Sequence, residues 1–302
     1  MAGQRREEKR NQNLMHLIKR VHSVVEGADL NRQRQSQESI GALLGNRKEN
    51  LVREISIDGM YAEWISVDRA HMKKYVILYC HGGGYMTGSC LYARTLTNKL
   101  ASSTSMDVLC FEYRLAPEHP YPAALEDAMR AWNYLMLLGY GARDIIVAGD
   151  SAGGNLALAL VHKLKQEERL LPRGLVLMSP WTDLTASGRT HRTRAEVDPV
   201  LDAAYIAQAV ESYAGKEKEL ENPLISPLFG DFTGFPPTYI QVGNNEILLS
   251  DSMLLHKRMI KANVSVKLDI FPGMWHVFQM SPFKKAYDAM DKNAEFIYDI
   301  CR

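Results

Sequence analysis

Short apolar runs and longer amphipathic runs alternate along most of the chain. The apolar runs have the length and composition of buried strands. They lie at residues 76–80, 106–113, 145–149, 174–179, 238–242 and 264–271. Runs with helical spacing separate them, at residues 92–104, 122–138, 152–168, 251–262 and 282–299. Strands that alternate with helices are typical of βαβ units, so the pattern predicts an α/β fold on a mostly parallel sheet.

Two stretches near the start of the chain differ from this alternation. In residues 51–67, two apolar stretches flank Asp58-Gly59, a strong signal for a hairpin turn. We therefore expect an antiparallel hairpin before the parallel strands. Residues 12–26 carry apolar side chains at helical spacing and predict an amphipathic helix that needs a partner face.

The composition is that of an ordinary globular enzyme. The chain has 302 residues, 46% of them hydrophobic and 24% charged, and a formal net charge of +1. Such a balance gives no reason to expect nucleic acid or an acidic membrane as a partner. No run of about 18 apolar residues predicts a membrane span, and residues 1–20 lack the apolar core of a signal peptide. We expect a cytoplasmic location.

The cysteines do not predict a metal site. They lack the spacing of zinc ligands, and they lie at Cys80, Cys90, Cys110 and Cys301. We expect reduced thiols, no metal and no cofactor.

Two glycine-rich segments directly follow predicted strands. Residues 81–84 have the sequence His-Gly-Gly-Gly, and residues 149–153 have the sequence Gly-Asp-Ser-Ala-Gly. The second fits Gly-x-Ser-x-Gly, which places a serine, here Ser151, on a sharp turn between a strand and a helix. The first is a loop whose backbone N–H groups can face that serine. Each could be a plain tight turn, but the strand before Ser151 and the helix after it favour a nucleophile and an oxyanion cradle.

Further segments carry a family resemblance. They are residues 113–123 with 126–128, residues 179–183 (Ser-Pro-Trp-Thr-Asp) and residues 226–228 (Ser-Pro-Leu). Together with the two glycine motifs, they resemble the hormone-sensitive-lipase family of α/β-hydrolases, in its bacterial carboxylesterase branch. The resemblance runs from about residue 50 to the C-terminus and implies an eight-stranded, mostly parallel sheet flanked by helices. It also implies a helical cap and a Ser-acid-His triad.

The resemblance implies a division of the chain. Residues 1–45 would be an N-terminal helical part of the cap, 46–183 and 232–302 the α/β-hydrolase core, and 184–231 a cap insert. For the helix at 12–26, an ordinary helix packed on the body is an equally compatible interpretation.

The stretch between the strands at 174–179 and 238–242 is too long for a simple crossover, and excess of this kind usually carries function. Within it, Asp198-Pro199 predicts a helix start and Gly215 a helix stop.

His276 is the best candidate for the base that a serine nucleophile needs. In α/β-hydrolases the chain order is Ser, acid, His. Five of the nine histidines precede Ser151 and break this order: His16, His22, His71, His81 and His119. Three others lie on predicted helices or in the insert: His162, His191 and His256. Of the four histidines after Ser151, only His276 lies in a loop just past a predicted strand, and the family has a similar Gly-x-x-His-x-Phe context there.

Glu246 is the predicted acid. The resemblance implies Asp-x-Leu after a strand ending in Val-Gly, and this chain has Glu246 at the matching position. A glutamate can fill the role, because the acid accepts the histidine N–H and stabilises imidazolium. Asp251 is a rival that is better explained as a cap of the following helix. Asp198 and Asp183 are weaker rivals.

The oxyanion donors follow from the motif and from the resemblance. The residue after the nucleophile, Ala152, supplies one N–H group. Family correspondence adds the N–H groups of Gly83 and Gly84, and His81 is expected to hold the loop by hydrogen bonds.

These residues predict a serine hydrolase that cleaves short- to medium-chain carboxylic esters through an acyl-enzyme. A specialised deacetylase of sugars or small molecules is an alternative on the same site. A third possibility is a non-catalytic binding protein, because the family includes a plant hormone receptor that has lost its catalytic histidine; here Ser151, Glu246 and His276 are all present. The expected partners are a small-molecule ester and, by family habit, a second copy of the chain.

Overall fold

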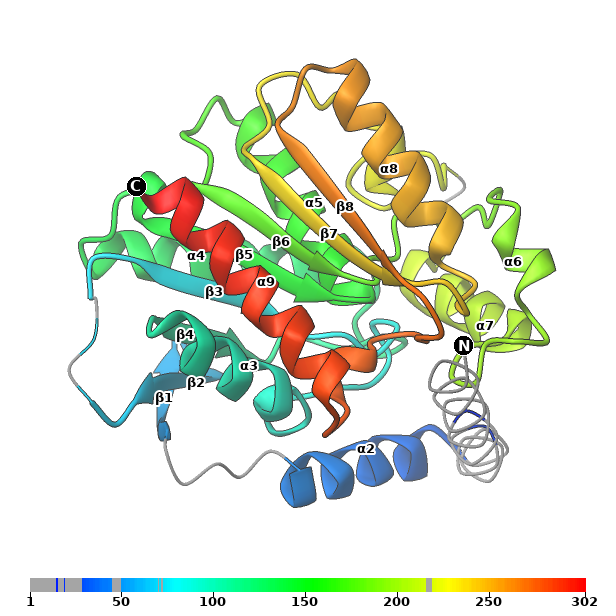
Figure 1. Cartoon of the computed structure of the whole chain (residues 1–302), viewed down its shortest axis with the longest axis horizontal. Coiled ribbons are helices and arrows are strands. Elements are labelled where there is room, and N and C mark those ends of the chain that lie inside the picture. Colours follow the sequence, from blue (N-terminus) through cyan, green and yellow to red (C-terminus); the bar gives the residue numbers. More distant parts are fainter. Residues whose placement is uncertain are drawn as a thin grey trace, which may run out of the picture.

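The computed structural model describes residues 15, 19, 29–44, 50–69, 71, 73–215 and 219–302. Its centre is one eight-stranded sheet with the order β1-β2-β4-β3-β5-β6-β7-β8 (Figure 1). The strands are β1 (Asn50–Ile57), β2 (Met60–Val67), β3 (Val76–Cys80), β4 (Asp107–Phe111), β5 (Ile145–Asp150), β6 (Gly174–Met178), β7 (Thr238–Gly243) and β8 (Val266–Phe271). β2 is antiparallel to β1 and to β4, and the remaining pairs are parallel. The predicted hairpin and parallel sheet are confirmed.

Helices cover both faces of the sheet. They are α2 (Leu30–Leu44), α3 (Cys90–Thr104), α4 (Ala123–Leu137), α5 (Ala152–Gln166), α6 (Thr190–Thr193), α7 (Ala203–Ala214), α8 (Leu249–Lys261) and α9 (Lys284–Cys301). Short 3₁₀ turns lie at η1 (Ala142–Asp144), η2 (Pro227–Phe229) and η3 (Phe278–Met280). Helices α3 and α9 lie on one face, and α4, α5 and α8 lie on the other (Figure 1). The predicted helix at 12–26 lies outside the described residues except for Met15 and Lys19, which are helical.

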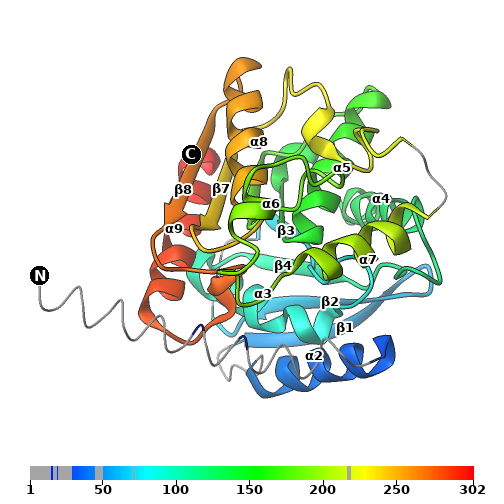
Figure 2. The ribbon, with the colours of Figure 1, turned by 90° about the vertical axis from the view of Figure 1, so that its right-hand side faces the viewer.

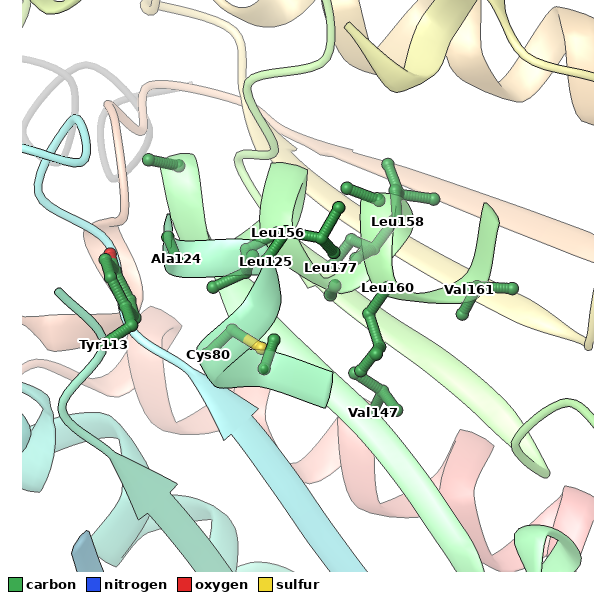
Figure 3. Close-up of a cluster of buried hydrophobic side chains, with 14 of the residues drawn as sticks. Cys80, Tyr113, Ala124, Leu125, Val147, Leu156, Leu158, Leu160, Val161 and Leu177 are labelled. Carbon is green, nitrogen blue, oxygen red and sulfur yellow. The ribbon is translucent and has the colours of Figure 1, made fainter. Parts of the chain in front are cut away.

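Most residues of the inner parallel strands are apolar because helices shield both of their sides. All five residues of β3 are buried. Along β5, Val147 faces α5, whereas Ile146 and Ala148 face α3 and α9. Figure 3 shows Leu160 of α5 close to Val147 in the first of these two cores.

The segment between β6 and β7 carries α6 and α7. Both helices lie at the end of the sheet where the parallel strands finish (Figures 1 and 2). Helix α7 stops at Gly215 as expected, with φ of 59° at that residue. The predicted start at Asp198 is wrong: α7 begins at Ala203, where the Asp202 side chain accepts the Tyr205 N–H at 2.7 Å.

None of the helices in the described ranges combines the length and the apolar content needed to cross a membrane.

We expect Leu160→Ala to lower the free energy of unfolding by about 2–5 kcal/mol, because it opens a cavity in the core that holds α5 against the sheet. Leu160 is 0% exposed, whereas Leu170, in the loop after α5, is 73% exposed. The matched control Leu170→Ala should change stability by no more than about 0.5 kcal/mol. Urea denaturation of both variants measures the difference, and equal midpoints would contradict the burial of Leu160 between α5 and the sheet.

Candidate active site

Ser151 occupies a strained turn between β5 and α5. Its φ and ψ are 53° and −122°, outside the regions that residues with a side chain normally adopt. A Cβ on Gly153 would lie 2.0 Å from the Cys80 carbonyl oxygen, and one on Gly149 would lie 2.4 Å from the Gly153 carbonyl oxygen. The glycines of the motif are therefore required by the close approach of α5 to β3. The turn is held by the Ser151 N–H, which donates to the Met178 carbonyl at 3.0 Å.

The structure brings Ser151, His276 and Glu246 together. His276 Nε2 lies 2.9 Å from Ser151 Oγ, and His276 Nδ1 lies 2.9 Å from Glu246 Oε2. The serine follows β5, the glutamate follows β7 and the histidine follows β8, so each comes from the end of a different parallel strand. The side chains thus form one continuous chain of hydrogen bonds.

The second carboxylate oxygen of Glu246 is also engaged. Oε1 accepts the Gly243 N–H at 2.5 Å and the Ser179 hydroxyl at 2.9 Å. Ser179 Oγ in turn accepts the Val277 N–H at 3.2 Å, so it joins the loop of Glu246 to the loop of His276. Sequence reasoning did not single out Ser179; its only signal was its place in the Ser-Pro-Trp-Thr-Asp segment.

The charges around His276 favour its protonated form. Burial alone lowers the pKa of the imidazole, but the hydrogen bond and charge of Glu246, together with the charges of Asp198 and Asp150, outweigh burial. The net result is a pKa above the ordinary value of 6.5. Burial raises the pKa of Asp150 to about 6, against hydrogen bonds from Tyr79 and Gly82 and the charge of His276.

The loop of residues 81–84 has a conformation that needs glycine. Gly83 and Gly84 have φ values of 119° and 61°. A Cβ on Gly83 would lie 2.2 Å from the Thr87 carbonyl oxygen. Within the described ranges, no group accepts a hydrogen bond from the N–H of Gly83, Gly84 or Ala152. These N–H groups are therefore available to an oxygen atom from a substrate.

Side chains from several elements hold this loop. Asp150 Oδ1 accepts the Gly82 N–H at 3.0 Å and the Tyr79 hydroxyl at 2.6 Å. His81 Nδ1 donates to the Gly82 carbonyl at 2.8 Å, and its ring stacks on Tyr113. Burial lowers the pKa of His81 to about 4, so this histidine is neutral. From α2, Arg34 Nε donates to the Met86 carbonyl at 2.8 Å.

Two of the rival carboxylates have other partners. Asp251 Oδ2 accepts the N–H groups of Thr182 and Asp183, and Asp251 Oδ1 accepts from His191 Nε2 at 2.8 Å. Helix α8 begins at Leu249 without a side-chain cap, so the interpretation of Asp251 as a helix cap is wrong. Asp183 accepts from Thr185 and Ser187, close to it in the chain.

Asp198 is buried near the site, and its Oδ2 accepts the N–H of Ile247, the residue after Glu246.

In the described ranges, no group of three or more His, Cys, Asp or Glu side chains is arranged to hold a metal ion. All four cysteines are free thiols.

Known proteins are similar to this chain in sequence and in fold. A family profile described as the alpha/beta hydrolase fold matches residues 77–280. An esterase of Acinetobacter venetianus is 39% identical over 247 residues, which cover 81% of each chain. An acetyl-hydrolase of Streptomyces hygroscopicus is 38% identical over 225 residues, or 74% of each chain. The crystal structure of an esterase from the bacterial hormone-sensitive lipase family superposes with a TM-score of 0.90 at 31% identity and covers 96% of this chain and 97% of its own.

Proposed function

Because this chain belongs to the hormone-sensitive-lipase family of α/β-hydrolases and is a carboxylic ester hydrolase, we propose that Ser151, His276 and Glu246 are its catalytic triad. The observation that carries the proposal is the unbroken chain of hydrogen bonds from Glu246 through His276 to Ser151. In this proposal, ester cleavage proceeds through an acyl-enzyme on Ser151.

The first step forms the acyl-enzyme. His276 Nε2 takes the proton of Ser151 Oγ as that oxygen bonds to the ester carbonyl carbon, and the carbonyl oxygen becomes an oxyanion. The imidazolium then gives its proton to the leaving alkoxide oxygen as the C–O bond breaks. The 2.9 Å separation of Nε2 and Oγ supports this transfer, because it is within hydrogen-bond reach.

Glu246 orients the base. It accepts the Nδ1–H of His276, which leaves Nε2 free to take the serine proton, and it stabilises the imidazolium formed during the reaction. Its Oε1 is fixed by Gly243 and Ser179, so Oε2 keeps one position. A glutamate fills the role although it is one methylene longer than aspartate.

The N–H groups of Gly83, Gly84 and Ala152 stabilise the oxyanion. Fixed donors of this kind are worth about 3 kcal/mol each in comparable sites, because they need no reorganisation when charge develops. In the second half of the cycle, His276 takes a proton from water, the resulting hydroxide attacks the acyl carbon, and Ser151 leaves with a proton.

Residues 184–231 act as a cap that shapes the pocket, together with residues 1–45. In support, Tyr205 of α7 lies directly over the glycine loop: a Cβ on Gly84 would be 2.6 Å from its hydroxyl oxygen. From the N-terminal segment, Arg34 contacts the Met86 carbonyl just after that loop. The closeness of Tyr205 to the oxyanion donors favours short to medium acyl groups.

Further proposals concern location and assembly. We place the enzyme in the cytoplasm and expect it to form a homodimer, through the sheet edge or through the C-terminal helix α9; in the described sheet, β8 is an edge strand, and its Ile270 is 41% exposed.

We expect Ser151→Ala to lower kcat/KM for p-nitrophenyl acetate by at least about 10⁴-fold, because the acyl-enzyme can no longer form. Ser103→Ala, on the remote helix α3, is the matched control and should keep the wild-type rate. Thermal melting of both variants checks that they fold. Hydrolysis by folded Ser151→Ala at the wild-type rate would contradict the proposal.

The rate should depend on pH through His276. The reaction needs the neutral imidazole, and a pKa above 6.5 keeps the ring protonated to higher pH. The half-maximal kcat/KM on the acidic side is therefore expected above pH 6.5, not at this value. Glu246 contributes most to raising the pKa of His276, through its hydrogen bond and its charge. Glu246→Gln removes that charge, so the acidic limb of the variant should lie at lower pH. A wild-type midpoint below pH 6 in folded protein would count against His276 as the base.

A panel of p-nitrophenyl esters from C2 to C12 tests the acyl group. We expect kcat/KM to be highest between C2 and C6 and at least about tenfold lower at C12, because the phenol of Tyr205 limits the space beside the oxyanion loop. The acetyl-hydrolase relative favours a second candidate, a specialised deacetylase. Faster turnover of acetylated oligosaccharides than of any p-nitrophenyl ester would establish that alternative.

A further inference from the structure

A buried carboxylate of the insert reaches the loop that carries Glu246. Asp198 is 2% exposed. Its Oδ1 accepts the N–H groups of Val200 at 2.9 Å and Leu201 at 3.1 Å. Its Oδ2 accepts the N–H of Ile247 at 2.9 Å. The side chain thus joins two segments of the chain that are 49 residues apart.

Two side chains of the insert bind the backbone of Ile247, one at its N–H and one at its carbonyl, and we call these two hydrogen bonds the clamp. Its N–H donates to Asp198, and its carbonyl accepts the Thr190 hydroxyl of α6 at 2.6 Å. The side chain of Glu246 is fixed by other groups, at Gly243 and Ser179. The clamp therefore fixes the backbone that carries this side chain.

Asp198 is not needed to start a helix. Helix α7 begins at Ala203 and has its own cap in Asp202. The only bond from Asp198 to a distant part of the chain is the one to Ile247, among the hydrogen bonds of the described residues. A buried carboxylate is costly unless its oxygens are satisfied, and here both oxygens accept N–H groups.

We propose that Asp198 is a positioning residue of this enzyme: through the Ile247 peptide it holds Glu246 against His276, and its negative charge adds to the field at the imidazole. The inference rests on the proposed roles of Glu246 and His276. It assigns to the insert a part in aligning the triad, in addition to any contact with substrate.

The electrostatics around Asp198 agree with this geometry. Burial raises the pKa of Asp198 to about 6, the charge of His276 opposes that rise, and the charge of Glu246 adds to it. The acidic groups that act on His276 are Glu246, Asp198 and Asp150. Each favours the imidazolium, so removal of one negative charge makes His276 a weaker base.

Asp198→Asn tests the proposal. The amide keeps the size of the side chain but removes the charge. We expect kcat for p-nitrophenyl acetate to fall about 10- to 100-fold, because a small misplacement of a catalytic group has effects of this size. KM should change by less than about threefold, since both oxygens of Asp198 are already bound to backbone N–H groups of the protein. The acidic limb of kcat/KM should move to lower pH.

Asp183→Asn is the matched control. Asp183 is also fully buried at the edge of the insert, but it accepts hydrogen bonds from its own loop. Its variant should keep the wild-type acidic limb, even where it melts at lower temperature. If Asp198→Asn keeps kcat within about twofold and the same limb as Asp183→Asn, the inference is wrong.

Thr190→Val separates geometry from charge. It removes the hydroxyl that binds the Ile247 carbonyl and leaves Asp198 in place, so kcat should fall while the acidic limb stays at the wild-type pH. This variant also decides the matter where Asp198→Asn does not fold, because an unchanged kcat would exclude the clamp. Failure of the proposed function gives a different result: Ser151→Ala or Glu246→Gln would then retain wild-type activity.

Discussion

The close approach of α5 to the end of β3 is the constraint on which the site depends. It is possible only because residue 153 has no side chain: a Cβ there would lie 2.0 Å from the Cys80 carbonyl oxygen. The approach forces the turn at Ser151 into its unusual backbone conformation, with φ of 53°. Strain of this kind persists only where the surroundings hold it. The same approach sets the Ala152 N–H beside the glycine loop that follows β3, so one packing contact fixes both the proposed nucleophile and the proposed oxyanion donors.

A second set of contacts brings the proposed base and the proposed acid to that turn. The loops after β7 and β8 are joined through Ser179, whose hydroxyl donates to Glu246 and accepts the Val277 N–H. Because β7 and β8 are parallel neighbours, their ends lie together. Hydrogen bonds through one side chain are therefore enough to set the relative positions of Glu246 and His276. The geometry of the proposed triad thus comes from backbone and side-chain hydrogen bonds around it as much as from the hydrogen bonds within it.

The sequence predicted those features of the structure that depend on interactions between neighbouring residues. The strands, the hairpin at Asp58-Gly59 and the turn at Ser151 follow from side-chain size, periodicity and glycine, and the structure has all of them. The positions of Asp198 and Asp251 could not be predicted in this way. Both residues lie near the start of a helical segment, where an aspartate side chain usually caps the helix. Instead, each accepts an N–H group from a residue about 50 to 70 positions away in the chain. Ser179 was missed for the same reason, since its partners come together only when the sheet forms.

Burial of carboxylates beside His276 lowers the stability of the folded chain at neutral pH. The folded-state pKa values of Asp150 and Asp198, about 6, lie above the ordinary value of 3.8. A carboxyl group whose pKa rises on folding binds protons more readily in the folded state, so its unfavourable contribution is full above pH 6 and diminishes as the pH falls towards 4. The site therefore contains two carboxylates that lower the free energy of unfolding at neutral pH. Their hydrogen bonds give the reason, because one fixes the glycine loop and the other fixes the loop of Glu246. The two carboxylates that order the site thus also lower the stability of the folded chain at neutral pH.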